Sequence, residues 1–506
     1  MLRRVAFVST IGLLALGALA PEARAVSCGP APKAKPHRWT GGESFPPLPL
    51  PVTPLRRSEK KRPPAPPALV GKIQYGKVVT GTDEKGGRYT YREWTHAAGD
   101  IKGLMRRVNG NLGIRYRGVA TDLARFSFSP EELPVLYLSG REAFELDDAV
   151  RAKLRVYLQD GGTLVGNASS GSEDFFKSFV VEMNKLFPRR RMLELPSDHP
   201  IYTTYFRIKT VEYLVDGKSF RAPPKLWGVN IGCRAAVVFA PYDLACAWDN
   251  HFHEKGRRVW SAKRGPEDAY RLGVNTIAYA LASYRYGRYM ANGKVYFEAD
   301  APAGDRLAFG QIVHGGDWDP CPGAAMGLFK YAAANSTLGV QFRREAVDLR
   351  TAKAFSHPVL YLTGHHDFVL ADEEIANLRR YLAGGGFLLA DACCGRREFD
   401  AAFRREIARV LPGAKLEKLP AAHPLYAAAG ERVASVGYTP AVRATKGEVK
   451  TLPLEGLQYK GHLCVVYSPY ALGAGWQEEQ SPYSLGVAPK DARRLGLAAL
   501  MYAMTH

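Results

Sequence analysis

Cysteine is scarce in this chain, and its few residues follow no regular spacing. Seven cysteines occur among 506 residues, at positions 28, 233, 246, 321, 393, 394 and 464. A disulfide-built fold needs many cysteines in a short chain, and a zinc finger needs compact pairs such as Cys-x-x-Cys. Neither framework can therefore organise this fold, although one or two isolated disulfides remain open.

Long apolar runs are lacking beyond the first residues. Two arginines precede an apolar run over residues 5–20, and Ala23-Arg24-Ala25 has the small-x-small pattern of a signal-peptide cleavage site. The run is shorter than the roughly 20 residues that a membrane-spanning helix needs. We therefore expect a signal peptide over residues 1–25 and a mature protein exported to the periplasm or the cell exterior, without a transmembrane segment. Lipidation at Cys28 is the less favoured alternative.

Acidic residues are outnumbered by basic ones. Asp and Glu number 49 against 69 Lys and Arg, which gives a formal net charge of +20. Such an excess attracts anionic partners, although a solvated basic surface alone would also keep a protein soluble. Because we expect export, the expected partner is an anionic envelope polymer or an envelope protein and not nucleic acid.

Prolines with interspersed lysines and arginines dominate residues 26–70. Proline removes backbone donors and favours extended backbone, so such a segment does not pack into a domain. We expect a semi-rigid basic linker here.

Two similar halves follow the linker. The segment Pro134–Gly140 recurs as Pro358–Gly364, 224 residues later (358 − 134), and several further pairs share nearly the same spacing. Many matches at one spacing indicate an internal duplication. We expect a first domain over residues 71–290 and a second over residues 291–506.

Each half alternates apolar runs with helical patterns. In the second half, the continuous apolar run over 358–363 predicts a strand buried on both faces. Apolar residues three and four apart predict a helix over 373–383, which Gly384-Gly385-Gly386 ends. Further strands are predicted over 387–390 and 462–468, and further helices over 400–411 and 491–504. This βαβ alternation predicts an α/β fold with a mostly parallel sheet in each half.

Several short sequence motifs in the second half are typical of one protein family. They are Gly315-Gly-Asp-Trp318, Tyr361-Leu-Thr-Gly-His365, Gly385-Gly-Phe-Leu-Leu-Ala-Asp391-Ala-Cys393 and Ser468-Pro-Tyr470. Together they resemble the bacterial domain-of-unknown-function family 4159 (DUF4159), and both halves carry the pattern. The resemblance implies two tandem flavodoxin-like, class I glutamine-amidotransferase-like three-layer sandwiches. It implies no established activity.

The loops that follow the predicted strands carry the candidate chemistry. In a parallel sheet the carboxyl ends of neighbouring strands meet at one edge, where ligands bind. The candidate catalytic residues are Cys393 or Cys394 as nucleophile, His365, His423 or else His366 as base, and Asp391 as the group that orients the base. The candidate ligand-binding residues are His366, Asp367, Pro469, Tyr470, Asp317 and Trp318.

Other interpretations of these residues stay open. Imidazoles and carboxylates also bind zinc, but here they lack compact spacing, so we expect no metal and no other cofactor. In purely structural roles, His423-Pro424 would stabilise a turn, and His314 and Asp317 would cap the helix that follows them. The triplet Arg189-Arg190-Arg191 could bind anions, although solvated charge is the default expectation.

These residues favour a non-catalytic or degenerate amidotransferase-like module that binds an anionic or carbohydrate-like envelope ligand. An amidotransferase carries Gly-x-Cys-x-Gly and a later His-x-Glu, whereas the turn here reads Asp-Ala-Cys-Cys-Gly and no such pair follows the 462–468 strand. A cysteine-dependent hydrolase or amidase centred on the second half is one alternative. A structural or assembly partner of envelope machinery is another.

Overall fold

The strands of each half pair into a seven-stranded sheet. The computed structural model describes residues 65–82, 87–252, 255–292, 306–336, 341–478 and 481–506. In the first half the order across the sheet is β4 (Arg117–Thr121), β1 (Ala68–Ile73), β5 (Val135–Gly140), β6 (Thr163–Ala168), β11 (Arg234–Ala240), β10 (Trp227–Ile231) and β7 (Leu193–Glu194). In the second half it is β14 (Gln341–Val347), β13 (Arg306–Ile312), β15 (Val359–Gly364), β16 (Phe387–Ala392), β19 (His462–Ser468), β18 (Glu455–Tyr459) and β17 (Glu417–Lys418).

The two strand orders correspond one to one, so the duplication in the sequence is a duplication of the fold. The first five strands of each order pair in parallel, and the last two pair antiparallel. This confirms the predicted α/β class with mostly parallel sheets.

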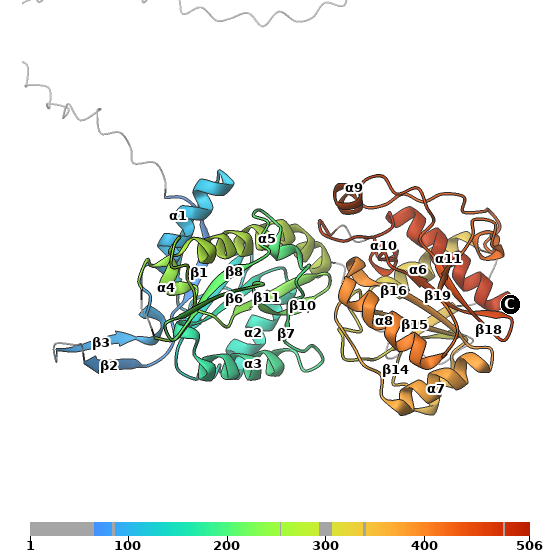
Figure 1. The fold of residues 1–506 in the computed structure, drawn as a ribbon, viewed down its shortest axis with the longest axis horizontal. Helices are drawn as coiled ribbons and strands as arrows, with labels where there is room; N and C mark the ends of the chain where they lie inside the picture. Colours follow the sequence, from blue (N-terminus) through green and yellow to red (C-terminus); the bar gives the residue numbers. More distant parts are fainter. Residues whose placement is uncertain (1–64, 83–86, 253–254, 293–305, 337–340, 479–480) are drawn as a thin grey trace, which may run out of the picture. The chain divides into compact units, whose positions relative to one another are not determined.

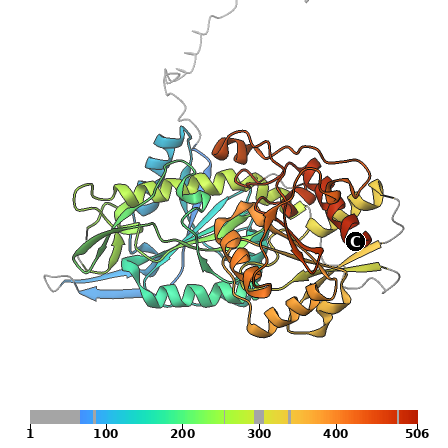
Figure 2. The same ribbon diagram turned by 45° about the vertical axis from the view of Figure 1, so that its right-hand side comes forward.

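Helices cover both faces of each sheet, which gives three layers (Figures 1 and 2). In the first half, α1 (Asp100–Leu112) and α5 (Glu267–Asn292) pack on one face, and α2 (Asp148–Gln159) and α3 (Glu173–Leu186) on the other. In the second half, α6 (Ala324–Asn335) and α11 (Pro489–Thr505) lie opposite α7 (Asp372–Ala383) and α8 (Arg397–Val410).

Strand residues alternate between the two cores of a half, as the period of two along a strand requires. Val135 and Tyr137 of β5 belong to the core beneath α1 and α5, whereas Leu136 and Leu138 belong to the core beneath α2 and α3. A strand of this kind is apolar at every position. That is why the parallel strands were recognisable as continuous apolar runs.

Smaller elements complete the described part of the chain. They are the hairpin β2 (Val78–Thr82) and β3 (Arg88–Arg92), the three-stranded sheet β8 (Val211–Val215), β9 (Lys218–Ala222) and β12 (Arg257–Val259), and the short helices α4 (Ala245–Trp248), α9 (Pro440–Lys446) and α10 (Gly473–Trp476). None of the helices in the described ranges is long and apolar enough to cross a membrane.

The secondary structure predicted for the second half is confirmed closely. The expected strands over 358–363, 387–390 and 462–468 correspond to β15, β16 and β19. The expected helices over 373–383 and 491–504 correspond to α7 and α11. The helix α8 starts at Arg397, three residues before the predicted 400, directly after the turn that carries the two adjacent cysteines.

The first residues of the chain lie outside the described ranges. They include the expected signal peptide over 1–25 and the expected linker as far as residue 64. The first described strand, β1, begins at Ala68, within the last residues of the expected linker.

Candidate functional site

The second sheet offers a crevice where its strand order reverses. The chain passes from β13 to its neighbour β14, and then returns to β15 on the other side of β13. The loops that leave the carboxyl ends of β13 and β15 therefore diverge. Ligands of open α/β sheets bind at such a point.

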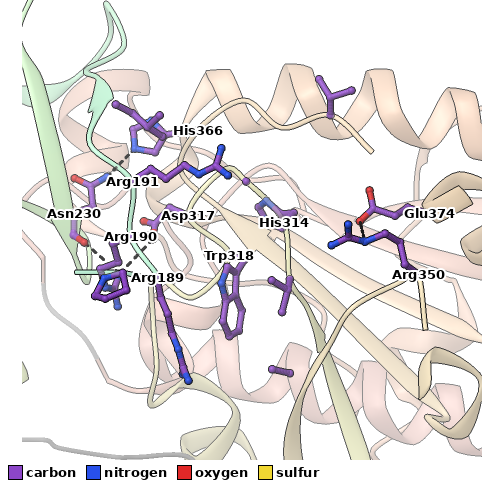
Figure 3. A pocket seen from close by; sticks show the side chains of 16 residues that line it. Arg189, Arg190, Arg191, Asn230, His314, Asp317, Trp318, Arg350, His366 and Glu374 are labelled. Carbon is purple, nitrogen blue, oxygen red and sulfur yellow. Dashed lines mark hydrogen bonds and ion pairs between the residues drawn. The ribbon is translucent and has the colours of Figure 1, made fainter. Parts of the chain in front are cut away.

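A cavity of about 650 Å³ opens at this crevice (Figure 3). It is lined by loops after all three strands, with His314, Asp317 and Trp318 after β13, Arg350 after β14, and His366 after β15. Further lining comes from the first half, through Pro188, Arg189, Arg190, Arg191, Leu193 and Asn230. The volume is in the range of small-molecule sites, which is about 300–1,000 Å³.

Arginines dominate the charge of this pocket. Arg190 forms an ion pair with Asp317 at 3.3 Å, and Arg350 pairs with Asp348 at 3.0 Å. Arg189 and Arg191 are exposed and form no ion pair with any acidic residue in the described ranges. The pocket therefore presents two uncompensated guanidinium groups.

Hydrogen bonds hold the part of the pocket lining that lies between the arginines and the loop after β15. The Asn230 side-chain amide donates to Nε2 of His366 at 2.9 Å, so Nδ1 of His366 carries the proton and faces Glu398 Oε2 at 3.4 Å. Arg190 also donates to the backbone oxygen of Asn230 at 3.1 Å. These contacts hold the pocket lining in one arrangement without using Arg189 or Arg191.

In the first half, aromatic side chains pack together at the turn that follows β1. Tyr75, which follows β1, donates to the backbone oxygen of Ser139 at 3.0 Å. Its ring lies 5.8 Å from the ring of Phe144 and 6.3 Å from that of Phe175. The first half has a cavity of its own of about 470 Å³, lined by Trp94 and by residues of α1 and β4.

Beside the pocket lies a buried cluster of thiols. Cys393 Sγ lies 3.4 Å from Cys233 Sγ and 3.6 Å from Cys321 Sγ, and Cys233 and Cys321 are 3.8 Å apart. Cys394 and His365 join this cluster, because the donor atoms of Cys233, Cys393, Cys394 and His365 all lie within 4.8 Å of one another. All four cysteines are free thiols and buried.

His365 connects the cluster to Asp317. Its Nδ1 lies 2.7 Å from Asp317 Oδ2, while its Nε2 is buried and has no hydrogen-bond partner. Burial alone would lower the pKa of His365, but Asp317 and the neighbouring Cys394 raise it to about 9. The Asp317 carboxyl, held by His365 and Arg190, keeps a lowered pKa despite its burial.

Asp317, His365 and Cys394 thus form a line of acid, base and thiol. The backbone of Cys394 has φ 53°, a left-handed conformation on a sharp strand-to-helix turn. An activated cysteine needs a lowered pKa and access to substrate. Burial instead raises the pKa of Cys394, and the thiol is 2% exposed.

The carboxylate of Asp391 is committed to backbone and hydroxyl contacts. It accepts the Tyr361 hydroxyl at 2.5 Å and the backbone N–H groups of Leu472 and Gly473 at 2.6 and 3.1 Å. Asn167 at the equivalent place in the first half accepts the N–H of Leu244 at 2.8 Å in the same way. Asp391 therefore fixes the entry into α10.

The contacts of the remaining predicted residues are with groups other than the thiols. His423 accepts the N–H of Leu425 at 3.1 Å, as expected for a turn, and its ring lies 5.7 Å from that of Tyr502. Asp367 pairs with Arg405 at 2.8 Å near the surface. Pro469 and Tyr470 follow β19, next to β16, and the Tyr470 ring lies 4.5 Å from the Lys446 ammonium.

The expectation that His314 and Asp317 cap the next helix is wrong. The helix α6 begins after Gly323 and has no side-chain cap. His314 instead binds the N–H of Gly316 at 3.0 Å and the backbone oxygen of Thr363 at 2.8 Å. It thereby holds the β13 loop against the end of β15.

Sequence reasoning did not assign Cys233 or Cys321 to any site, and it treated Arg189–Arg191 as solvated charge. Cys233 is 160 residues from Cys393, so no spacing rule joins them. The sequence feature that points to Cys393, Cys394 and His365 is the internal duplication, because these residues differ between the two copies. At equivalent positions of the repeat, Ser169 and Ser170 stand for Cys393 and Cys394, and Arg141 stands for His365.

A comparison with family models agrees with the internal duplication. The family model of a domain of unknown function, DUF4159, matches residues 84–281 and 308–504. No curated protein matches the chain. Eleven chains of solved structures do. One is a protein described as ThuA-like from Bacteroides uniformis ATCC 8492, with 13% identity over 44% of this chain and 96% of that chain, and a TM-score of 0.23.

Proposed function

The chain belongs to the DUF4159 family, and we propose that it is an exported binding protein whose pocket in the second half takes an anionic, carbohydrate-like envelope ligand. The observation that carries this proposal is the pair of uncompensated arginines, Arg189 and Arg191, at a cavity of about 650 Å³. Guanidinium groups bind carboxylate, sulfate and phosphate through two parallel hydrogen bonds.

The rest of the lining suits a ring-shaped ligand. Trp318 supplies a flat aromatic surface, and Val369, which is 69% exposed, supplies an apolar lip. Aromatic rings pack against the apolar faces of sugars as well as other rings, while charged groups at the rim select the sign of the ligand. An acidic sugar or a short acidic glycan satisfies both features.

Fluorescence titration tests this proposal. Soluble peptidoglycan fragments, oligogalacturonate and neutral maltooligosaccharides of equal length would each be added at low and at high salt. We expect saturable binding of an acidic ligand that weakens as salt rises, because screening reduces the attraction between exposed charges. Absence of saturable binding at low salt for every acidic ligand would contradict the proposal.

Substitutions locate the binding. The double variant Arg189→Ala, Arg191→Ala should weaken binding of the acidic ligand about tenfold or more, since each charge-assisted contact contributes on the order of 1.5–3 kcal/mol. Arg125→Ala is the matched control, because Arg125 is a 90% exposed arginine that pairs only with Asp122 in the described ranges. Equal loss in both variants would indicate general charge attraction and no specific site.

The alternative of a cysteine-dependent hydrolase has less support. The Asp317–His365–Cys394 line provides the residue types, but the thiol is buried and the pocket is lined by His366 and not by Cys394. Native protein treated with iodoacetamide at neutral pH separates the two functions. Rapid, single-site alkylation of Cys394 would favour the hydrolase, whereas unreactive thiols would favour binding.

A further inference from the structure

The thiol cluster is assembled from segments that lie far apart in the sequence. Cys233 occupies the two-residue turn between β10 and β11, where Gly232 has φ +61°. Cys393 and Cys394 follow β16, and His365 follows β15. Four donor atoms of the types that bind thiophilic metals therefore converge in one buried volume.

We propose that Cys233, Cys393, Cys394 and His365 bind one zinc ion in a closed tetrahedral site. Zinc holds thiolate sulfur at about 2.3 Å and imidazole nitrogen at about 2.0–2.1 Å, so neighbouring ligand atoms of a tetrahedron are roughly 3.5–3.8 Å apart. The Cys233 and Cys393 sulfurs are 3.4 Å apart, and all four donor atoms lie within 4.8 Å of one another.

His365 is oriented as a metal ligand. The carboxylate of Asp317 accepts from Nδ1, which leaves Nε2 as the coordinating nitrogen, and Nε2 is the buried atom without a partner. A hydrogen bond from the other ring N–H of a zinc-binding histidine to a carboxylate is a regular feature of zinc sites, because it fixes the tautomer and the ring plane. Arg190, paired with Asp317 at 3.3 Å, adds positive charge behind a site that carries three thiolates.

A disulfide explains the cluster less well. The S–S bond is about 2.05 Å long, so the 3.4 Å between the Cys233 and Cys393 sulfurs is a contact of free thiols. One disulfide would also leave Cys394 and the unpartnered Nε2 of His365 without a role. Zinc employs all of these atoms at once.

Burial assigns the site a structural role. Cys233, His365, Cys393 and Cys394 are each at most 4% exposed. A catalytic zinc keeps one position open to water or substrate, whereas a structural zinc is enclosed by four protein ligands. Since Cys233 belongs to the first half and the other three ligands to the second, the ion would tie the two halves together.

Elemental analysis of the full chain tests this inference. Protein purified under reducing conditions, or reconstituted with zinc chloride, should contain one zinc ion per chain. Replacement by cobalt should produce sulfur-to-cobalt charge-transfer absorption and the intense visible bands of tetrahedral Co²⁺. Both measurements use wild-type protein, so they do not depend on a variant that folds.

Variants identify the ligands. Cys393→Ser and His365→Ala should each lose zinc, whereas Cys464→Ser should keep it, because Cys464 is a buried thiol whose sulfur contacts the backbone oxygen of Leu457 instead. Cys321→Ser should also keep zinc, because Cys321 is outside the group of four. The thiols should resist a disulfide reagent until a chelator is added.

Several results would overturn the inference. They are absence of bound zinc after reconstitution, iron and sulfide in place of zinc, full zinc content in Cys393→Ser, or a Cys233–Cys393 disulfide found by mass spectrometry in protein isolated without reductant. Loss of zinc in Cys321→Ser with retention in Cys394→Ser would refute the assigned set of ligands. The ligand-binding proposal is unaffected by any of these results, since it depends on Arg189 and Arg191.

Discussion

Equivalent residues of the two halves show which side chains serve the fold and which distinguish one copy. Asp391 and Asn167 occupy the same place and accept the N–H of equivalent leucines, Leu472 and Leu244. An ionised carboxylate is therefore not required for this contact. Burial raises the pKa of Asp391, although the Tyr361 hydroxyl and the backbone N–H groups oppose the shift.

Asp391→Asn should preserve the fold, whereas Asp391→Ala should destabilise it. The alanine leaves the N–H groups of Leu472 and Gly473 without their acceptor, and each unpaired buried donor costs about 1–3 kcal/mol. The free energies of unfolding of the two variants, measured in urea, check this expectation. Equal destabilisation by asparagine and alanine would show that the charge matters.

His314 should make stability depend on pH. Burial lowers the pKa of His314 from 6.5 to about 4, so the folded chain holds this imidazole neutral while the unfolded chain protonates it first. The unfolded state then binds more protons between pH 6.5 and 4, and stability falls as pH falls through that window, by up to about 3 kcal/mol. The contribution is fully present above pH 6.5.

The variant His314→Gln isolates this effect. Glutamine can still donate to the Thr363 oxygen but does not titrate, so its unfolding free energy should fall less than that of the wild type between pH 7 and pH 4.5. Other histidines titrate in both proteins and cancel in the comparison. Parallel pH profiles for the two proteins would exclude His314 as a source of acid sensitivity.

Among the elements, the glycine-rich stop after α7 has a specific steric cause. A Cβ on Gly386 would lie 2.4 Å from the Tyr381 ring, and Gly385 has φ +93°. Tyr381 is held in place because its hydroxyl donates to the backbone oxygen of His357 at 2.9 Å. In the first half, Gly162 meets Tyr157 in the same way, with a Cβ distance of 2.3 Å.

Gly386→Ala should therefore cost about 1–3 kcal/mol of stability, the usual range for overpacking a filled core. Gly384→Ala is the control, since its nearest Cβ contact is 3.3 Å, to the Arg380 backbone oxygen, and its φ is negative. Thermal unfolding of both variants checks the difference. A mild effect at Gly386 would mean that the Tyr381 ring can move aside.

The elements of the fold were predictable because their signals are local or repeated. Apolar runs such as 358–363 and the helical spacing over 373–383 are each contained within a few residues. Because the fold is duplicated, such patterns occur in both halves. The pocket and the cluster are not local. They depend on which loops meet, so Arg189 and Cys233, both from the first half, could not be placed beside His366 and Cys393 from spacing alone.

Considered as a whole, residues Ala65–His506 form one compact unit in which a few polar and aromatic contacts join the halves. Asn230 binds His366 at 2.9 Å, and the rings of Tyr279 and Tyr483 stack at 5.4 Å. Cys233 of the first half also packs in the same buried cluster as Cys321 and Cys393 of the second half. The halves are therefore expected to influence each other's stability through a small number of residues.

Arg190→Ala should weaken this coupling. It removes the ion pair with Asp317 and the hydrogen bond to the Asn230 oxygen, together about 1–2 kcal/mol at a partly buried position. Scanning calorimetry should show the unfolding transitions of the halves moving apart. Arg288→Ala, which removes a pair with Glu131 inside the first half at 2.7 Å, should leave their separation unchanged.

The position of Cys233 also determines when, during synthesis of the chain, its thiol becomes buried. Its thiol is covered by Cys321 and Cys393, which are 88 and 160 residues further along. A chain growing on the ribosome completes the first sheet while that sulfur is still bare at the tip of a hairpin. A product that stops before residue 321 lacks both of these covering cysteines, so we expect its Cys233 thiol to be accessible to thiol reagents, unlike that of the complete chain.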